Sequence, residues 1–568
     1  MKLLSITLDG EYKGLRSDTF DFSQSEGRLL AFIGLNGSGK SQLLELIAES
    51  FACLERKQRK DFKTKNSLGF NVSLSFEINT EAEQLSHYLQ TLILLSTVQT
   101  KPTFKVKIDR NGEIETFFLI NNDWQDIESS HLVLPEYVVG YSSGLNENLQ
   151  RSFMKNAVQY NDVMRTRLNL RKKLLADIDE EQRIVINKEF LQNNPQLCDM
   201  PPFDQLEEHD FLELRENISP IPSLMFMDYD SNSLLLAAIC LLPKQELYIL
   251  LAEAKYNIPK VLEFRYNLRG DIANEDVIRD IKLLIRLAGE ENISGIGQQA
   301  SDEQYELFEL TYLSGLISFD LTCEETMAKL KEAHLGSPIA FFKRLYRLQL
   351  AGVQNWEGTT RSKLKRCDFK GTVKKPQKSK LPLSVERLEL ASENGTSVNI
   401  DDFSDGEAQL IQILAAARIF RDEQTLFLFD EPETHLNPSW RTYFHKHLAQ
   451  ANQVGDVWTN STQTLLSTHS PFMISSLKKS DVYRFERDND GLIKMNRAEN
   501  QTYGASFDVL IKEYFDLKSL ISQTVVEDIK AHLPKGDSQE EKDKARAWLN
   551  ENIGESMEKA YLLRKLQE

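Results

Sequence analysis

Both ends of the chain alternate between two patterns. One is a short apolar run that ends in glycine or in acidic residues, and the other is a stretch with apolar residues at helical spacing. Arg28–Gly34 (RLLAFIG) has the pattern of a buried strand, and SQLLELIAESF follows it with apolar residues at helical spacing. NVSLSFEI and TFKVKIDRNGEIETFFLI read as further strands, and the Asn111-Gly112 pair in the second run predicts a hairpin. Tyr137–Leu149 reads as a strand that leads into a polar loop.

The pattern changes to helices between residues 150 and 350, where charged residues mix with leucine. No heptad register persists over several repeats, so a long coiled-coil arm is not expected. Residues 361–380 hold nine Lys or Arg interrupted by Gly and Pro, and we interpret them as a mobile basic segment.

Strands return after this segment. SVERLELASENGTSVNI contains Asn394-Gly395, a second hairpin signal, and TLFLFDEPE, TLLSTHSPFMI and VYRFERDNDGLIKM follow with helical stretches between them. The last 60 or so residues are charged and helical in pattern. We therefore predict an α/β protein with a lobe over 1–150, a mainly helical insertion over 151–384, a second lobe over 385–510 and a helical tail over 511–568.

Composition restricts the protein classes to consider. The net charge of −17 over 568 residues argues against a protein that coats nucleic acid with its whole surface, but it leaves room for a local basic groove. The five cysteines are odd in number, scattered and without a CxxC pair, which favours reduced thiols. The N-terminus turns polar too early for a signal peptide, and the longest apolar run, Leu234–Leu242, is too short to span a bilayer. We expect a cytoplasmic protein without membrane contact.

A glycine-rich loop between a predicted strand and helix is the first candidate site. GLNGSGKS, from Gly34 to Ser41, fits G-x-x-x-x-G-K-[ST], in which backbone N–H groups and a helix N-terminus surround phosphate oxygens. Lys40 is expected to reach the β- and γ-phosphates of ATP, and Ser41 to ligate Mg²⁺. The predicted nucleotide contacts of this loop are Gly34, Asn36, Gly37, Ser38, Gly39, Lys40, Ser41 and Gln42.

Two later predicted strands end in residues whose side chains suit Mg²⁺ binding or catalysis. LFLFDEPE ends in Asp430, predicted to hold Mg²⁺, and Glu431, predicted to polarise the attacking water. We expect this strand to lie beside the strand of the glycine loop in a parallel sheet; the alternative is a strand that ends in solvated acids. LLSTHSP ends in His469, whose imidazole is predicted to hydrogen-bond the γ-phosphate and to join Glu431 and Lys40 in catalysis.

The tetrad Ser404-Asp405-Gly406-Glu407 resembles the signature motif of ABC-type ATPases, with Phe403 where that family usually has Leu. The alternative is an ordinary serine N-cap. The resemblance implies an ABC ATPase head, with a P-loop sheet and an antiparallel β subdomain, that uses ATP and Mg²⁺. It also implies a head-to-tail dimer with a second copy, in which Ser404, Gly406 and Glu407 lie at the nucleotide of the other head.

Within that class the chain resembles the SMC/RecF/OLD group. The separation of Ser41 from Ser404 is too long for a transporter head, and DEPETHLNP is similar to a run of OLD-like ATPases, with Asn437 in place of the usual His. The family's Q-loop glutamine is not evident. GYSSGLNE occupies its place, which makes Ser142, Ser143 and Asn146 the candidates for sensing the γ-phosphate or Mg²⁺.

YSSGLNENL, FSDGEAQL, LLSTHSPFMISSL and TYGASFDVLI look like the PtuA ATPases of Septu and retron anti-phage systems. This resemblance implies a partner HNH nuclease of the PtuB type and, in retron versions, a reverse transcriptase with its RNA–DNA product. It predicts an ATP-hydrolysing regulatory subunit of a defence complex. A RecF- or SMC-like DNA repair or DNA-tethering ATPase is the alternative.

The chain itself is not expected to be a nuclease, because the Asp-x-Asp after His469, Asp488-Asn489-Asp490, lies in the turn of the predicted VYRFERDNDGLIKM hairpin, and no HNH arrangement is evident. Asp228 and Asp230 after SLMFM form an acidic pair in the wrong place, and strand-end acids or helix caps are favoured there. Nucleic acid could contact the basic segment through its lysines and arginine; a solvated loop is the other interpretation. These residues are Lys363, Lys365, Arg366, Lys370, Lys374, Lys375, Lys378 and Lys380.

Overall fold

The computed structural model divides into two compact units, Met1–Gly504 and Ala505–Glu568, each of which is described by itself. The predicted boundary after residue 510 falls inside α15 (Phe507–Tyr514), whereas the units divide ahead of this helix. The structure describes residues 1–57, 68–79, 85–94, 101–143, 147–174, 179–193, 221–251, 256–268, 275–302, 304–305, 310–364, 377–392, 394–454, 457–458, 461–515, 521–534 and 538–566.

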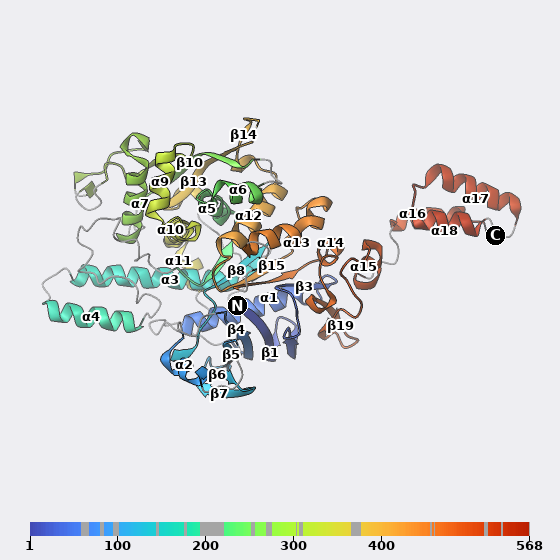
Figure 1. Cartoon of the computed structure of the whole chain (residues 1–568), viewed down its shortest axis with the longest axis horizontal. Helices are drawn as coiled ribbons and strands as arrows, with labels where there is room; N and C mark the ends of the chain where they lie inside the picture. The colour runs from blue at the N-terminus through green and yellow to red at the C-terminus, as the bar shows by residue number, and fades with distance from the viewer. Residues whose placement is uncertain are drawn as a thin grey trace. The chain divides into compact units, whose positions relative to one another are not determined.

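A seven-stranded sheet in the order β20-β19-β3-β18-β15-β8-β9 forms the centre of the larger unit (Figure 1). All neighbouring pairs are parallel except β19 with β20. The strands are β3 (Leu29–Gly34), β8 (Tyr137–Ser142), β9 (Leu224–Met227), β15 (Thr425–Asp430), β18 (Thr462–Ser467), β19 (Val482–Arg487) and β20 (Ile493–Arg497).

We predicted that β15 would pair directly with β3. This prediction is wrong, because β18 lies between the two strands and pairs with both. Every residue of β3, β15 and β18 is buried, as expected for strands covered on both faces. Such apolar runs show that a strand is internal but not which neighbour it pairs with. This strand order places the end of β18, which His469 follows, between the ends of β3 and β15.

Helices cover both faces of this sheet. α1 (Lys40–Lys57) contacts β3, β8, β15 and β18, and α3 (Glu147–Leu174) packs on α1, β8 and β9. A buried ion cluster joins these two helices, because Glu49 of α1 accepts from Lys155 of α3 at 3.0 Å and from Arg56 at 3.2 Å. α12 (Asp405–Ile419) packs on α13 (Pro438–Asn452), and Figure 1 shows both on the opposite side of β15 from α1.

An antiparallel sheet in the order β2-β1-β4-β5-β6-β7 packs against α1 and shares its hydrophobic core. The hairpin predicted at Asn111-Gly112 is confirmed: it joins β5 to β6, and Gly112 has a φ of 84°. The strands are β1 (Lys2–Tyr12), β2 (Leu15–Asp21), β4 (Asn71–Glu77), β5 (Thr103–Ile108), β6 (Ile114–Ile120) and β7 (Asp123–Ile127), and α2 (His87–Leu94) lies between β4 and β5 in the chain.

The segment 151–384 is mainly helical but also contains β9 and three strands that the sequence analysis assigned to helices. β10, β11 and β12 join β13 and β14 in a second antiparallel sheet, order β11-β12-β10-β13-β14, and the hairpin predicted at Asn394-Gly395 joins its last two strands. In β10 charged residues alternate with apolar ones because one face is polar, and this alternation was masked by the surrounding helical pattern. The strands are β10 (Ile258–Asn267), β11 (Ile293–Gly295), β12 (Ser314–Asp320), β13 (Leu383–Ala391) and β14 (Ser397–Asn399).

The remaining helices of the larger unit are α4 (Glu180–Asn193), α5 (Tyr229–Ile239), α6 (Lys244–Leu251), α7 (Glu275–Ala288), α9 (Glu324–Ala333), α10 (Pro338–Ala351), α11 (Gly358–Leu364) and α14 (Pro471–Ile474), with the short pair β16 (Gln453–Val454) and β17 (Val457–Trp458). The smaller unit holds α15, α16 (Gln523–His532), α17 (Gln539–Asn552) and α18 (Met557–Lys565). The last three pack around a small core of Ile529, Ala545, Leu549 and Leu566.

The described helices include none with the length and apolar character needed to cross a membrane. Cys53, Cys240 and Cys323 form no disulfide with any described residue, while Cys198 and Cys367 lie outside the described residues. The predicted α/β architecture, with a P-loop sheet beside an antiparallel β subdomain, a mainly helical insertion and a helical tail, is confirmed.

Candidate functional site

The glycine loop turns sharply between β3 and α1, and two of its glycines cannot be replaced without collision. Gly34 has a φ of 144°, and a Cβ on it would lie 2.2 Å from the carbonyl oxygen of Phe485. Gly39 has a φ of 110°, and a Cβ there would lie 2.7 Å from the Ile493 side chain. Because both positions have positive φ and tight surroundings, the backbone path around the loop depends on glycine.

Lys40 begins α1 and folds back over this loop. It is only 4% exposed, and its Nζ donates to the carbonyl oxygens of Gly34 at 2.9 Å and Leu35 at 3.2 Å. Burial lowers the pKa of Lys40 to about 8, against the opposing effect of the nearby carboxylates, first Glu431 and then Asp430.

The loop also offers uncommitted polar groups. The hydroxyl oxygen of Ser38 is buried without a hydrogen-bond partner within the described part of the chain, and Asn36 and Gly37 are exposed at the rim, while Gln42 is half-buried in the first turn of α1. A buried cation, an orphaned hydroxyl and the N-terminus of α1 converge on one glycine-lined turn. These groups fit a chain of phosphates.

Ser41 and Asp430 form the predicted metal pair. The Ser41 hydroxyl donates to Asp430 Oδ1 at 2.8 Å, although the two residues are far apart in the sequence. Ser467, opposite Asp430 in the β15–β18 register, donates to the same oxygen, and the sequence analysis missed it. Hydroxyl and carboxylate oxygens are the ligands that Mg²⁺ prefers, so this pair fits the metal. Ser467 could have been found only from strand pairing.

Glu431 and His469 meet at the same edge of the sheet. His469 Nε2 lies 3.5 Å from Glu431 Oε1. Burial, with a smaller contribution from Asp430, raises the pKa of Glu431, and burial together with Lys40 lowers the pKa of His469 to about 4. His469 is therefore neutral at pH 7 and offers one donor and one acceptor.

Glu431 is also conformationally strained. Its φ is 52°, a left-handed value that costs a residue with a side chain about 1–3 kcal/mol and that clusters at functional sites. Its N–H donates to Ser467 O at 3.1 Å, which fixes the start of this turn to β18. The strain indicates that the fold holds this carboxylate in place against local preference.

The signature tetrad lies at the N-terminus of α12. Ser404 caps this helix in a reciprocal capping box: its hydroxyl accepts from Glu407 N at 3.3 Å, and Glu407 Oε2 accepts from Ser404 N at 3.0 Å. The N-cap interpretation of Ser404 is thus correct for the isolated chain. Glycine is required at position 406 for a separate structural reason: a Cβ there would lie 2.7 Å from His435 O.

This helix end is open to solvent. Ser404 and Asp405 are exposed, and within the described residues no hydrogen bond or ion pair joins the tetrad to the glycine loop of the same chain. The structure therefore brings together Gly34–Ser41, Asp430, Glu431 and His469, and keeps Ser404–Glu407 apart from them as a second exposed group.

The remaining candidates from the sequence either have structural roles or lie outside the residues that the structure describes. Ser143 hydrogen-bonds Thr434 through the two hydroxyls at 2.8 Å, Ser142 lies opposite Asp430 in the β8–β15 register, and Asn146 lies outside the described residues. Asn437 caps α13 by accepting from Trp440 N at 2.9 Å. In the basic segment, residues 365–376 lie outside the described residues, and Lys378 Nζ lies 3.8 Å from Asp401 Oδ2.

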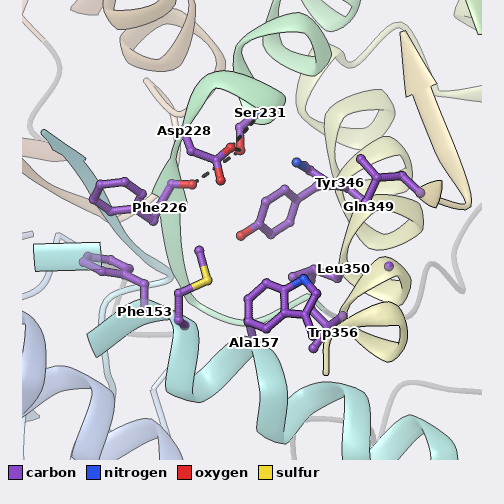
Figure 2. Close-up of a pocket in the computed structure, with 13 residues that line it drawn as sticks. Phe153, Ala157, Phe226, Asp228, Ser231, Tyr346, Gln349, Leu350 and Trp356 are labelled. Atoms are coloured by element: carbon purple, nitrogen blue, oxygen red, sulfur yellow. Dashed lines mark hydrogen bonds between the residues drawn. The ribbon is translucent and has the colours of Figure 1, made fainter. Parts of the chain in front are cut away.

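Asp228 is a helix cap rather than a metal ligand, as favoured from the sequence. It accepts from Ser231 N at 2.9 Å at the start of α5, while the side chain of Asp230 lies outside the description. Figure 2 shows Asp228 and Ser231 at one wall of a cavity of about 50 Å³, with Tyr346 and Trp356 facing them across it. This volume is well below that of a benzene-sized cavity, about 150 Å³, so it does not suggest a substrate site.

Comparison with known proteins gives a partial match over the second half of the site. Residues 354–475 match the family model described as "AAA domain, putative AbiEii toxin, Type IV TA system", a stretch that includes Ser404, Asp430, Glu431 and His469. Protein ea59 of Escherichia phage lambda is 30% identical over 110 residues, which are 18% of this chain and 20% of that protein. The chain therefore matches about a fifth of the length of this curated relative.

Among solved structures, the SMC head domain from Thermotoga maritima aligns over 88% of this chain and 100% of its own, with 12% identity and a TM-score of 0.28. The Smc head domain with a coiled coil and joint derived from Pyrococcus yayanosii aligns over 91% and 100%, with 16% identity and a TM-score of 0.32. Because these TM-scores are low, the fold described above rests on strand order and register. Residues 354–475 resemble an AAA-type ATPase domain.

Proposed function

We propose that this protein binds and hydrolyses ATP at the edge of the parallel sheet where Gly34–Ser41, Asp430, Glu431 and His469 converge. The observation that carries the proposal is the 2.8 Å contact of Ser41 with Asp430, with the Glu431–His469 pair at the same edge. Residues from three parallel strands and one helix N-terminus meet there, which is where ligands bind in sheets of this kind.

Each residue has a distinct part in the reaction. The loop N–H groups and Lys40 hold the phosphates, and Ser41 and Asp430 are placed to hold Mg²⁺, which neutralises charge that develops on the β- and γ-phosphate oxygens. Glu431 accepts a hydrogen bond from the attacking water and orients it. Neutral His469 donates a hydrogen bond toward the γ-phosphate.

The second part of the proposal concerns assembly. Ser404 and Asp405 are exposed at the N-terminus of α12, and the tetrad resembles an ABC signature; both features suit an anion brought by another copy. We infer that two copies close head to tail around two ATP molecules, so that Ser404 of one copy meets the γ-phosphate on the other.

The test of hydrolysis is the substitution Glu431→Gln. A glutamine keeps the size of the side chain but is a poorer acceptor, so we expect phosphate release to fall by about 10²–10⁴-fold while ATP binding persists. His435→Gln, at an exposed position that the proposed chemistry does not use, is the matched control and should keep normal turnover. Unchanged turnover in Glu431→Gln would remove this carboxylate from the reaction.

For the biological role, we propose a regulatory ATPase subunit of an anti-phage complex that controls a PtuB-like HNH nuclease, in some systems with a reverse transcriptase and its RNA–DNA. The support is the likeness of YSSGLNENL, FSDGEAQL, LLSTHSPFMISSL and TYGASFDVLI to PtuA ATPases. Co-purification with the products of adjacent genes, followed by mass measurement, tests it. Purified chain that cuts DNA or RNA alone would contradict it.

A RecF- or SMC-like DNA repair or tethering ATPase is the alternative, and the nine Lys or Arg of residues 361–380 favour it. This function predicts turnover that is stimulated by DNA without any toxin partner. Measuring phosphate release with and without duplex DNA separates the two roles.

A further inference from the structure

The motifs that define the site leave one buried acidic residue without a role. Glu433 follows Glu431 in the turn after β15, is 4% exposed, and none of the expected contacts with nucleotide or Mg²⁺ involves it. We propose that Glu433 is a positioning residue for hydrolysis, because its carboxylate ties the turn that carries Glu431 to the loop that carries His469. This inference rests on the proposed ATP hydrolysis and deepens it.

The carboxylate lies between the two catalytic segments. Glu433 Oε1 accepts from the Thr468 hydroxyl and from the backbone N–H of His469 at 3.3 Å. The Thr468 hydroxyl oxygen in turn accepts from Ser470 N at 2.9 Å, so one carboxylate oxygen organises the whole loop after β18. Since His469 is held through its own backbone, a movement of Glu433 moves the imidazole with it.

The turn needs such an anchor because Glu431 is strained at a φ of 52°. Thr434 donates to Glu431 O at 3.0 Å and meets Ser143 at 2.8 Å, and both contacts are exposed, whereas the part-buried bond from His435 N to Gln409 Oε1 at 3.0 Å ties the turn to α12 and not to the His469 loop. Hydrogen bonds in solvent contribute little, whereas a buried carboxylate that loses its partners costs its full desolvation. The bonds of Glu433 to Thr468 and His469 are therefore the strongest link that this turn makes to the loop.

The charge state of Glu433 is compatible with this role. Burial raises its pKa to about 7, and its Oε2 is buried without a hydrogen-bond partner among the described residues. The titratable groups that face it are Glu431 on its own turn, Lys40 on α1, Tyr141 on β8 and His469 on the loop. A proton on Oε2 leaves Oε1 free to accept both bonds, so a glutamine reproduces the protonated form.

Three variants of the full chain test the inference. Glu433→Ala and Thr468→Val each remove a link between the turn and the loop, and Glu433→Gln keeps the acceptor. We expect kcat for ATP to fall about 10–100-fold in Glu433→Ala with little change in KM, because misplacing a catalytic group affects the reaction more than ground-state binding. Glu433→Gln should restore kcat and should flatten the pH dependence of kcat near pH 7.

Amide hydrogen exchange of the peptide that spans Ser467–Ser470 gives a second readout that does not depend on turnover. Exchange should accelerate in Glu433→Ala and in Thr468→Val, and stay near wild type in Glu433→Gln. If Glu433→Ala does not fold, the comparison of Thr468→Val with Glu433→Gln still decides the question.

The outcomes separate the two proposals. Normal kcat and normal exchange in the two disrupting variants would overturn the role of Glu433 while leaving ATP hydrolysis intact. A wild-type chain without turnover would overturn the proposed function, and the exchange data would then decide by themselves whether Glu433 holds the His469 loop. Adding Glu433→Ala to His469→Ala should cause little further loss of kcat if Glu433 acts through His469.

Discussion

Replacing Lys40 by methionine should abolish ATP binding and yet stabilise the nucleotide-free chain at neutral pH. The ammonium of Lys40 is almost fully buried, and its pKa is lowered from 10.5 to about 8. The unfolded chain therefore binds the Lys40 proton more tightly than the folded chain, and the folded chain gains stability as pH rises from about 8 to 10.5. Below pH 8 the folded chain bears the full cost of the buried charge.

The magnitude follows from the same numbers. A pKa decrease of this size corresponds to roughly 3 kcal/mol, at about 1.4 kcal/mol per unit. Methionine has similar length but loses the two hydrogen bonds to Gly34 and Leu35 carbonyls, worth about 1 kcal/mol each. The net effect of Lys40→Met is a gain of about 1 kcal/mol at pH 7, which becomes a loss of about 1 kcal/mol at pH 10 and approaches about 2 kcal/mol once Lys40 is neutral in both the folded and the unfolded chain, above pH 10.5.

Urea unfolding of both proteins without nucleotide, at pH 7 and at pH 10, measures the two differences, and a fluorescent ATP analogue measures binding. The diagnostic result is a change of sign in the stability difference between the two pH values. If Lys40→Met is less stable than wild type by the same amount at both, the buried charge does not cost what the structure indicates, and the reasoning fails.

Three further variants probe the loop, the assembly and the surface. Gly34→Ala should destabilise the chain by about 1–3 kcal/mol and prevent ATP binding, because its Cβ would lie 2.2 Å from Phe485 O at a positive φ; unfolding and binding assays that match wild type would contradict this. Ser404→Arg should leave ATP binding to one copy intact while preventing ATP-dependent dimers in light scattering, and loss of binding itself would argue against a contact between copies. Replacing Lys374, Lys375, Lys378 and Lys380 by glutamine should weaken any nucleic-acid binding and lower its slope against log salt by up to about one for each phosphate that is no longer neutralised; an unchanged slope would exclude the segment.

Local chemistry made much of the site predictable. The spacing of Gly34, Gly39 and Lys40 encodes the phosphate loop because only glycine tolerates the positive φ values and close approaches seen there. Asp430 and His469 were found because each follows a short apolar run, and such runs become buried strands whose carboxyl ends meet at one edge. The capping box of Ser404 and Glu407 was equally local.

The missed features depend on neighbours that are distant in sequence. β10 becomes a strand by pairing with β12 and β13, which are distant in sequence, so the local pattern of β10 and β12 gave a weak signal. Ser467 and Glu433 are ordinary polar residues in the sequence, and only their burial against Asp430 and Thr468 gives them a role.

The sequence by itself determined which residues of this protein we propose to hold phosphates and Mg²⁺, because loop geometry and ligand chemistry are properties of short segments. The tertiary structure alone decided the strand order, with β18 between β3 and β15, and hence that His469 lies beside Glu431. It also decided that the buried Glu433 joins their two loops. Strand order and burial depend on how apolar faces from distant segments pack against one another. No short stretch of sequence carries that information.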